Sequence, residues 1–369
     1  MRNASQPYRV FVVDDSRTIR RLIGAIVEET DGLVLAGSAE SAEEAWDVLK
    51  NPQTAADVIS LDIELPGMNG IEFLRRLMAV RPIPVLVVSG HTDASADLTL
   101  TALETGAIDC IQKPDGRPQE IDRFIADTRA GLIRAAQSNQ KARGPSLAVP
   151  ARAARPAGPA LAVDPDTVIC IGASTGGVPA VCKVVAGLAG LGAPILVVQH
   201  MPPSFTGRLA ARLAQTTGLP SQEARDGDRL APGSVWVAPG GSHMRLVRKA
   251  GGYFASLAEE QPVSGHMPSI DVLFESAARQ AGGNAVGVIL TGMGRDGADG
   301  LLSMRNAGSP TFAQDEATSV VFGMPKAAAQ IGAVEQMLPL DRIADAVAAT
   351  LTLSRPDRPR RISQGARYV

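Results

Sequence analysis

The chain has 369 residues, of which 45% are hydrophobic and 20% charged, so it is long enough for two domains and too apolar to be disordered throughout. A formal net charge of -2 gives no overall electrostatic reason to bind nucleic acid, and we expect no such partner. The N-terminus lacks the long apolar stretch of a secretory signal, and no apolar run approaches the ~20 residues that cross a bilayer, so we expect a cytoplasmic protein without membrane insertion.

The first third of the chain alternates short apolar runs with longer amphipathic ones, which is the pattern of a parallel sheet with crossover helices. Ser16 can cap the first helix, and Ser41 with Glu44 forms a capping-box pattern at the second. Further helices are predicted at 70–80, at 97–105 and after Pro118. Strands are predicted at 9–13, 33–36, 58–61, 84–88 and 107–111. Five such units predict a doubly wound, flavodoxin-like α/β domain over residues 8–135.

Polar side chains follow four of these predicted strands, at the edge where the carboxyl ends of parallel strands meet. Asp14 and Asp15 follow the first strand and Asp62 ends the third, while Ser89 and Lys113 follow the fourth and fifth. Each aspartate alone is better explained as a helix cap or loop residue, but three carboxylates at one edge need a cation, and their oxygens suit Mg2+. We expect Asp62 to attack a phosphoryl donor, with Ser89 and Lys113 contacting the phosphoryl oxygens.

The segments VVDDS, LDIELPGMNG, VVSG and GAIDCIQKP resemble the signature segments of response-regulator receiver domains. The resemblance covers residues 9 to about 135. It implies that Asp62 is the phospho-acceptor, that the two neighbouring aspartates hold Mg2+ with it, and that Ser89 and Lys113 are the switch pair. It also implies a histidine kinase as phosphoryl donor. Cys110 departs from the family pattern, which usually has an aromatic residue there.

From Ser138 to Val163 the composition shifts to Ala, Pro, Arg and Gly, which predicts a semi-stiff linker over residues 136–163. The alternation of strands and helices then resumes and predicts a second parallel-sheet, Rossmann-like α/β domain over 164–354. Its strands are expected at 167–171, 194–198, 285–290 and 310–313. Residues 233–239 and the region after His243 are interpreted as an inserted hairpin, and residues 355–369 as a basic tail.

A second set of polar side chains follows strands of this second sheet. Ser174 is the centre of a G-x-S-x-G pattern, in which a sharp strand-to-helix turn exposes the hydroxyl. His200 and Asp296 each follow another predicted strand, so all three are expected at one sheet edge. Because a serine hydroxyl is a weak nucleophile at neutral pH, we predict that His200 is its general base and that Asp296 orients the imidazole. Thr175, at the start of the helix, can donate its N–H to an oxyanion.

Three alternatives remain for this half of the chain. His243 and His266 lie in loops and are alternative bases, although a structural or substrate-contacting role is favoured for both. Residues 292–297, GMGRDG, match a dinucleotide-binding fingerprint with Asp315 about 20 residues further on, so a nucleotide-binding module is possible. That fingerprint normally sits on the first strand of its unit and would leave the serine and histidine without a role. The third alternative is an output domain that binds without catalysis.

The segments GASTGG, QHMPPSFTGRLA, GDRLAPGSVWVAPGGSHM, SIDVLF, LTGMGRDGADG and AQDEATSVVFGMP resemble the catalytic domain of chemotaxis protein-glutamate methylesterases. The resemblance implies Ser174 as nucleophile, His200 as general base and Asp296 as its partner. It places Thr175 and the backbone of Met293 at the oxyanion. The implied substrate is a glutamate γ-methyl ester on a cytoplasmic helix of a methyl-accepting chemotaxis receptor, and the same acyl-enzyme chemistry would deamidate glutamines.

A receiver domain in front of an esterase predicts a phosphorylation-activated hydrolase. A Pro-rich linker of about 25 residues is long enough for one domain to dock over the other's sheet edge and to let it go. We therefore hypothesise that the receiver restrains the esterase and that phosphorylation of Asp62 relieves this restraint. Mg2+ is expected as the cofactor of receiver phosphorylation, and no cofactor is expected for the esterase.

Overall fold

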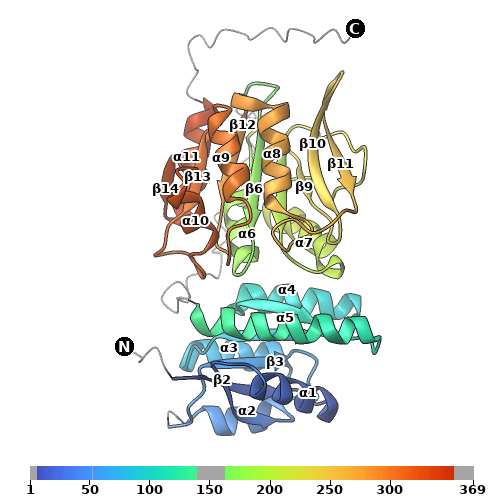
Figure 1. Cartoon of the computed structure of the whole chain (residues 1–369), viewed down its shortest axis with the longest axis vertical. Coiled ribbons are helices and arrows are strands. Elements are labelled where there is room, and N and C mark those ends of the chain that lie inside the picture. Colours follow the sequence, from blue (N-terminus) through green and yellow to red (C-terminus); the bar gives the residue numbers. More distant parts are fainter. Residues whose placement is uncertain (1–5, 52, 139–162, 353–369) are drawn as a thin grey trace.

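The chain folds into two α/β halves that are each built around one parallel sheet (Figure 1). The computed structural model describes residues 6–51, 53–138 and 163–352. The predicted linker, 136–163, lies outside these residues except at its two ends, and the predicted tail lies wholly outside them. We call the two described parts the receiver half and the catalytic half.

The receiver half has the strand order β2-β1-β3-β4-β5 with every pairing parallel, which confirms the predicted flavodoxin-like fold. Ser16 and Ser41 cap α1 and α2 as predicted. Helix α4 begins at Asp93, before the predicted residue 97, because the Thr92 hydroxyl accepts a hydrogen bond from Ser95 N. The elements are β1 (Tyr8–Val13), α1 (Arg17–Glu28), β2 (Leu33–Ala39), α2 (Ala42–Leu49), β3 (Val58–Asp62), α3 (Gly70–Val80), β4 (Val85–Ser89), α4 (Asp93–Thr105), β5 (Asp109–Gln112) and α5 (Pro118–Gln137).

The catalytic half has a seven-stranded sheet of order β14-β13-β12-β6-β7-β9-β8, again parallel throughout. The α/β class predicted for it is therefore confirmed. Its elements are β6 (Val168–Ala173), α6 (Gly177–Gly187), β7 (Ile195–Gln199), α7 (Pro203–Thr217), β8 (Ser221–Glu223), β9 (Val235–Val237), β10 (His243–Lys249), β11 (Gly252–Ala258), α8 (Ile270–Gln280), η3 (Gly282–Asn284), β12 (Ala285–Ile289), α9 (Ala298–Asn306), β13 (Thr311–Gln314), α10 (Met324–Gln330), β14 (Gln336–Leu338) and α11 (Leu340–Thr352).

One part of the predicted hairpin is wrong. Residues 235–237 form β9, which pairs in parallel with β7 inside the main sheet, and only β10 and β11 form an antiparallel hairpin. The local sequence did not distinguish a strand of the main sheet from a strand of the hairpin. In the structure, the side chains of Val235, Trp236 and Val237 are all buried. The hairpin lies beside β9 at one side of the catalytic half (Figure 1).

The two halves pack against each other through one face of the receiver half. Helices α4 and α5 lie between the receiver sheet and the catalytic half (Figure 1), and α4 packs against α6 and α7. Buried apolar side chains of α4 and of α6 belong to one continuous hydrophobic cluster, including Leu103 and Val178. At the rim of this contact, the Arg212 guanidinium forms a two-pronged ion pair with the carboxylate of Glu104.

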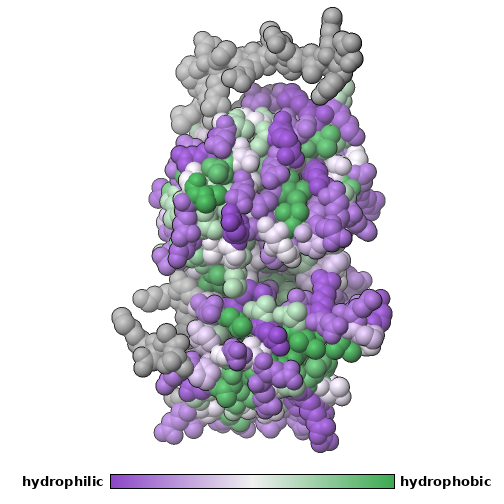
Figure 2. All heavy atoms as spheres, in the orientation of Figure 1, coloured by the Kyte–Doolittle hydropathy of each residue, from purple (hydrophilic) through white to green (hydrophobic). Residues whose placement is uncertain are grey.

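The surface of the molecule is mainly polar. Figure 2 shows hydrophilic side chains over most of the face in view, with smaller apolar patches between them. Among the described residues, no helix combines the length and the apolar character that a membrane span requires.

Candidate active site and phosphorylation site

The predicted nucleophile, Ser174, lies in the tight turn between β6 and α6. Its backbone N–H donates to Thr291 O at 3.0 Å, which ties the turn to the end of β12. Gly176 has φ +73°, a left-handed conformation that side chains rarely adopt, and it caps α6. A Cβ on Gly177 would lie 2.1 Å from Gln199 Oε1 and 2.8 Å from Ala173 Cβ, so a side chain there would force buried neighbours to shift. The glycines of the motif therefore allow the turn to press against the neighbouring strand ends.

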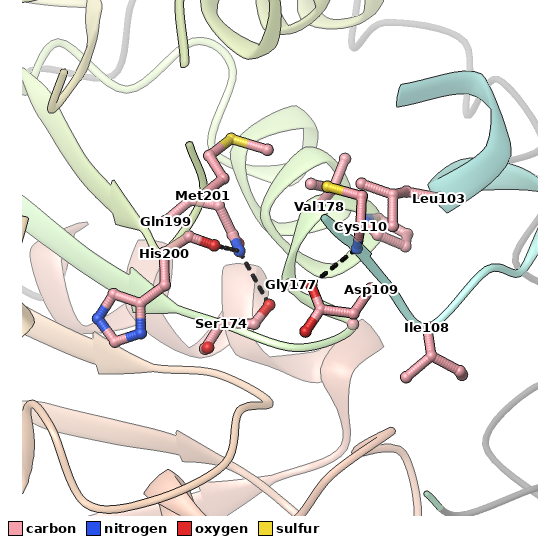
Figure 3. A pocket seen from close by; sticks show the side chains of 12 residues that line it. Leu103, Ile108, Asp109, Cys110, Ser174, Gly177, Val178, Gln199, His200 and Met201 are labelled. Carbon is pink, nitrogen blue, oxygen red and sulfur yellow. Dashed lines mark hydrogen bonds between the residues drawn. The ribbon is translucent and has the colours of Figure 1, made fainter. Parts of the chain in front are cut away.

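The predicted base and acid are hydrogen-bonded to each other. His200 follows β7, Asp296 follows β12, and His200 Nε2 lies 2.8 Å from Asp296 Oδ2. Both side chains are buried, at 8% and 1% exposure. The other ring nitrogen, His200 Nδ1, is also buried and has no hydrogen-bond partner among the described residues. Figure 3 shows the Ser174 hydroxyl pointing toward the His200 imidazole. The free Nδ1 is thus the nitrogen available to a proton from Ser174.

Asp296 is held ionised at the N-terminus of α8. It accepts hydrogen bonds from Ser269 Oγ and Ile270 N, both at 2.7 Å, and from Asp271 N at 3.2 Å. Burial alone would raise the pKa of this carboxyl, but the bond from His200 and those from the helix terminus outweigh burial and lower the pKa to about 2. An ionised Asp296 fixes the tautomer of His200, because Nε2 must carry the proton that it shares.

The predicted oxyanion donors, Thr175 and Met293, lie on the two loops beside Ser174. Neither backbone N–H donates to another group of the described residues, so both are free to bind an oxyanion. The Thr175 side chain is buried and donates through Oγ1 to Asp109 Oδ2 of the receiver half at 3.1 Å. Met293 is 42% exposed.

The two alternative bases have different surroundings. His243 is fully buried; Nε2 lies 3.1 Å from Gln261 O, and Nδ1 accepts from Ser269 N at 3.1 Å. Both of its nitrogens are therefore committed to the backbone. His266 instead lies flat on the ring of His200, with 3.7 Å between the ring centroids and 10° between the planes. The sequence pattern gave no sign of this stack, since two loops far apart in the chain form it.

The fingerprint at residues 292–297 serves a different purpose from the one that it suggested. Its aspartate is Asp296, which is bonded to His200. Asp315, the acidic residue further along, accepts from Thr318 N and from Thr318 Oγ1, so a local turn occupies one of its oxygens. A Cβ on Gly292 would lie 2.7 Å from Ser174 Cβ. The glycine therefore lets this loop approach the nucleophile, which does not favour the nucleotide-binding alternative.

The predicted carboxylates of the receiver half meet at the end of its sheet. Ligand oxygens of Asp14, Asp15 and Asp62 all lie within 4.8 Å of one another. Lys113 Nζ lies 2.6 Å from Asp62 Oδ2 and 3.0 Å from Asp14 Oδ2. Apart from that ion pair, Asp14 Oδ2 is buried without a hydrogen-bond partner among the described residues. Burial raises the pKa of Asp14 in spite of Lys113. An acidic oxygen cluster in which one buried oxygen has only an ion pair fits a hard cation such as Mg2+.

The predicted switch serine is bonded to α4. Ser89 is fully buried, accepts a hydrogen bond from Thr99 Oγ1 at 2.7 Å, and donates to Ser95 O at 3.3 Å. Both partners belong to the helix that packs on the catalytic half. Any movement of Ser89 toward a phosphoryl group on Asp62 would break these bonds.

The receiver half contacts the turn that carries Ser174. A pocket beside Ser174 has walls from both halves (Figure 3). Gly176 N donates to Ile108 O of the receiver half at 3.1 Å, so a receiver carbonyl binds one N–H at the N-terminus of α6. The residues that line the pocket are Leu103, Ile108, Asp109, Cys110, Ser174, Gly176, Gly177, Val178, Pro179, Gln199, His200 and Met201.

Comparison with known proteins yields two family matches. Residues 169–347 match the CheB methylesterase family, and residues 10–125 match the response regulator receiver domain. A protein-glutamate methylesterase/protein-glutamine glutaminase of Pseudomonas aeruginosa is 45% identical over 342 residues, covering 92% of this chain and 96% of that protein. One of the same name from Caulobacter vibrioides is 44% identical, with 92% and 96% covered. The CheB methylesterase catalytic domain of Thermotoga maritima is 37% identical, covering 50% of this chain and 98% of that one, with a TM-score of 0.49.

Proposed function

The chain belongs to the protein-glutamate methylesterase/protein-glutamine glutaminase family, and on this premise we propose that it hydrolyses glutamate γ-methyl esters of chemotaxis receptors and deamidates receptor glutamines. The observation that carries the proposal for the site is the state of His200. One ring nitrogen is held by a buried carboxylate, and the other is free on the side of Ser174. This arrangement suits a base that receives a proton from a serine.

In the proposed reaction, the Ser174 oxygen attacks the γ-carbonyl carbon of the ester while His200 Nδ1 takes the hydroxyl proton. The tetrahedral intermediate collapses when the bond to the methoxy oxygen breaks, and His200 returns the proton to that oxygen, so methanol leaves. Water then attacks the acyl-enzyme, again giving its proton to His200, and restores Ser174 with release of glutamate. With a glutamine substrate, ammonia leaves in the first half of the reaction.

Electrostatic stabilisation would come from groups on the loops beside the nucleophile. The free backbone N–H groups of Thr175 and Met293 would bind the oxyanion, and the N-terminus of α6 adds a favourable field. Asp296, with its pKa held at about 2, would stabilise the imidazolium that forms on His200. Each contribution is present before the substrate binds and costs no reorganisation during the reaction.

Methanol release from a methylated receptor cytoplasmic fragment tests this proposal. We expect Ser174→Ala, His200→Ala and Asp296→Asn each to lower the rate by about 10³-fold or more, because the three act as a unit. For the same reason, a double variant should be little slower than Ser174→Ala alone. Full activity of Ser174→Ala would refute the mechanism.

We further propose that the docked receiver half restrains the esterase. The contacts that support this lie at the active-site turn itself: Ile108 O binds Gly176 N, and Asp109 binds the hydroxyl of Thr175. These contacts would place the receiver half in the way of a receptor helix that approached Ser174. Phosphorylation of Asp62 would draw Ser89 away from α4 and weaken the face that docks.

Two comparisons test the restraint. A protein that starts at Val163 should hydrolyse ester faster than the unphosphorylated full chain, and equal rates would contradict the proposal. Asp62→Asn should abolish activation of the full chain by acetyl phosphate, and the shorter protein, which lacks Asp62, should not respond to acetyl phosphate. The shorter protein also controls for any direct effect of acetyl phosphate on the esterase.

The remaining assignments follow from the same proposal. Asp14, Asp15 and Asp62 would hold Mg2+, which would offset their charge and that of the incoming phosphoryl group, and a histidine kinase would donate that group. The domains would be 8–135, 136–163 as linker, and 164–354, followed by a tail. Because the proposed substrates are cytoplasmic helices of receptors, the enzyme would act in the cytoplasm. The proposed serine mechanism would need no cofactor for hydrolysis.

A further inference from the structure

His266 is in ring contact with the proposed base, although it has no part in the serine, histidine and aspartate unit. Its imidazole lies parallel to that of His200, with 3.7 Å between centroids and 10° between planes. One edge of His200 is therefore fixed by Asp296 and one face by His266. A hydrogen bond at Nε2 leaves the ring free to turn about that contact, whereas a stacked face removes this freedom.

The loop that carries His266 is well defined by backbone contacts. Val263 and His266 exchange hydrogen bonds, at 3.1 Å from Val263 N and 2.9 Å from His266 N. The two residues between them have positive φ, at 54° for Ser264 and 80° for Gly265, which is the pattern of a tight type I′ turn. The next residue, Met267, accepts from Gly241 N at 3.1 Å. His266 is thus presented from a fixed turn.

The same segment holds both contacts of the base. Three residues after His266, Ser269 donates to Asp296 through its hydroxyl, and its own N–H is held by the buried His243. The stack and the carboxylate are therefore positioned by one short stretch of chain. Turning the His200 ring would disturb both of them together.

The charge state of His266 suits this place. Burial lowers the pKa of His266 to about 4, and repulsion from His200 adds to the effect. The charged or titratable groups around it are His200 and Asp296 of the catalytic half and Asp109 and Arg134 of the receiver half. At neutral pH the ring is uncharged, so its π face can lie against an imidazolium without charge repulsion.

We propose that His266 is a positioning residue for the hydrolysis: a neutral stacked ring that holds the His200 imidazole with Nδ1 toward Ser174 and stabilises its protonated form. This inference rests on the proposed function. His266 exchanges no proton with the substrate or with His200. Its contribution is the aromatic face, so another aromatic ring should replace it and an aliphatic side chain should not.

The test uses the full chain, activated with acetyl phosphate and Mg2+, and methanol release from a methylated receptor fragment. We expect His266→Ala to lower kcat about 10- to 100-fold with KM changed less than about twofold, the size expected for losing the alignment of a general base. His266→Phe should keep kcat within about threefold of the wild type. The pH dependence of kcat between pH 6 and 9 should be the same for the wild type and His266→Phe.

His91→Ala is the matched control, because His91 is an exposed histidine of the receiver half. Thermal unfolding checks each variant, and if His266→Ala does not fold, His266→Leu takes its place with the same expected loss of kcat. The inference is overturned by normal kcat in the Ala or Leu variant, by a change confined to KM, or by a Phe variant as slow as Ala. An inactive wild type with an intact fold would instead refute the proposed function, so the two failures are distinguishable.

Discussion

The ion pair between Glu104 of α4 and Arg212 of α7 offers a direct measure of how firmly the receiver half is docked. Arg212 Nε donates to Glu104 Oε1 at 2.8 Å, and Nη2 contacts the second carboxylate oxygen. The side chain of Arg212 is 34% exposed and that of Glu104 is 23% exposed. Glu104→Gln keeps the size of the side chain and one acceptor oxygen but removes the charge that pairs with Arg212.

The expected effect follows from the burial of the pair. Exposed ion pairs contribute about 0–1 kcal/mol, and breaking a fully buried one costs about 3–5 kcal/mol. Breaking a half-buried, two-pronged pair should cost an intermediate free energy of about 1.5 kcal/mol. Since about 1.4 kcal/mol changes an equilibrium tenfold, the undocked fraction should rise about tenfold where that fraction is small.

The assay is methanol release by the full chain without any phosphoryl donor. Glu104→Gln should raise this basal rate about tenfold, up to the limit set by the undocked enzyme, and should reduce the further gain from acetyl phosphate. Glu72→Gln is the control, because Glu72 pairs with Arg76 on the surface of α3 alone. An unchanged basal rate in Glu104→Gln, with normal phosphorylation, would show that this contact does not restrain the enzyme.

Three other variants test other parts of the structure. Asp14→Asn, or removal of Mg2+ with EDTA, should slow phosphorylation of Asp62 by acetyl phosphate at least about tenfold and leave basal hydrolysis unchanged; equal phosphorylation with EDTA would contradict the cation site. The folded-state pKa of His266, about 4, lies below its unfolded value, so its contribution to stability is complete above about pH 6.5 and is lost progressively as the pH falls from about 6.5 to 4. Between pH 7 and 4.5, urea titrations should therefore show the wild type losing about 2 kcal/mol more than His266→Phe. Gly292→Ala would push against Ser174 Cβ, 2.7 Å from the new methyl group, so kcat should fall about 100-fold; a normal kcat would mean that the two loops are free to separate.

Signals that are local in the sequence predicted most of the fold. Ser16 and Ser41 cap the helices that their spacing indicated, and the long apolar strands lie where they were expected. Strands β8 and β14 were missed, because each has only three residues; β8 is wholly polar and β14 has two apolar residues, so neither gives an apolar run of strand length. Strand β9 was misassigned because its burial depends on neighbours that the local pattern does not reveal.

The candidate site was predictable where its residues follow strands, since parallel strands bring their carboxyl ends to one edge. Ser174, His200 and Asp296 lie together for this reason, and their roles stay predictions until they are measured. The stack of His266 on His200 was not predictable, because a turn before α8 forms it and no spacing rule links the two residues. The bond from Gly176 N to Ile108 O was hidden for the same reason, since it joins the two halves.

Helix α4 contacts both the phosphorylation site and the catalytic half, and this double contact has a thermodynamic consequence. Its Thr99 and Ser95 hold Ser89 at the phosphorylation site, while its other side packs on α6 and α7. Coupling of binding free energies is reciprocal, so if a phosphoryl group at Asp62 favours the undocked state, as we propose, a ligand that requires the undocked state raises the affinity for that group by the same factor by which the group raises the affinity for the ligand. A receptor segment that occupies the exposed active site should then raise the affinity of the receiver for a phosphoryl mimic such as beryllofluoride. The substrate would thus act as an effector of the very domain that regulates its hydrolysis.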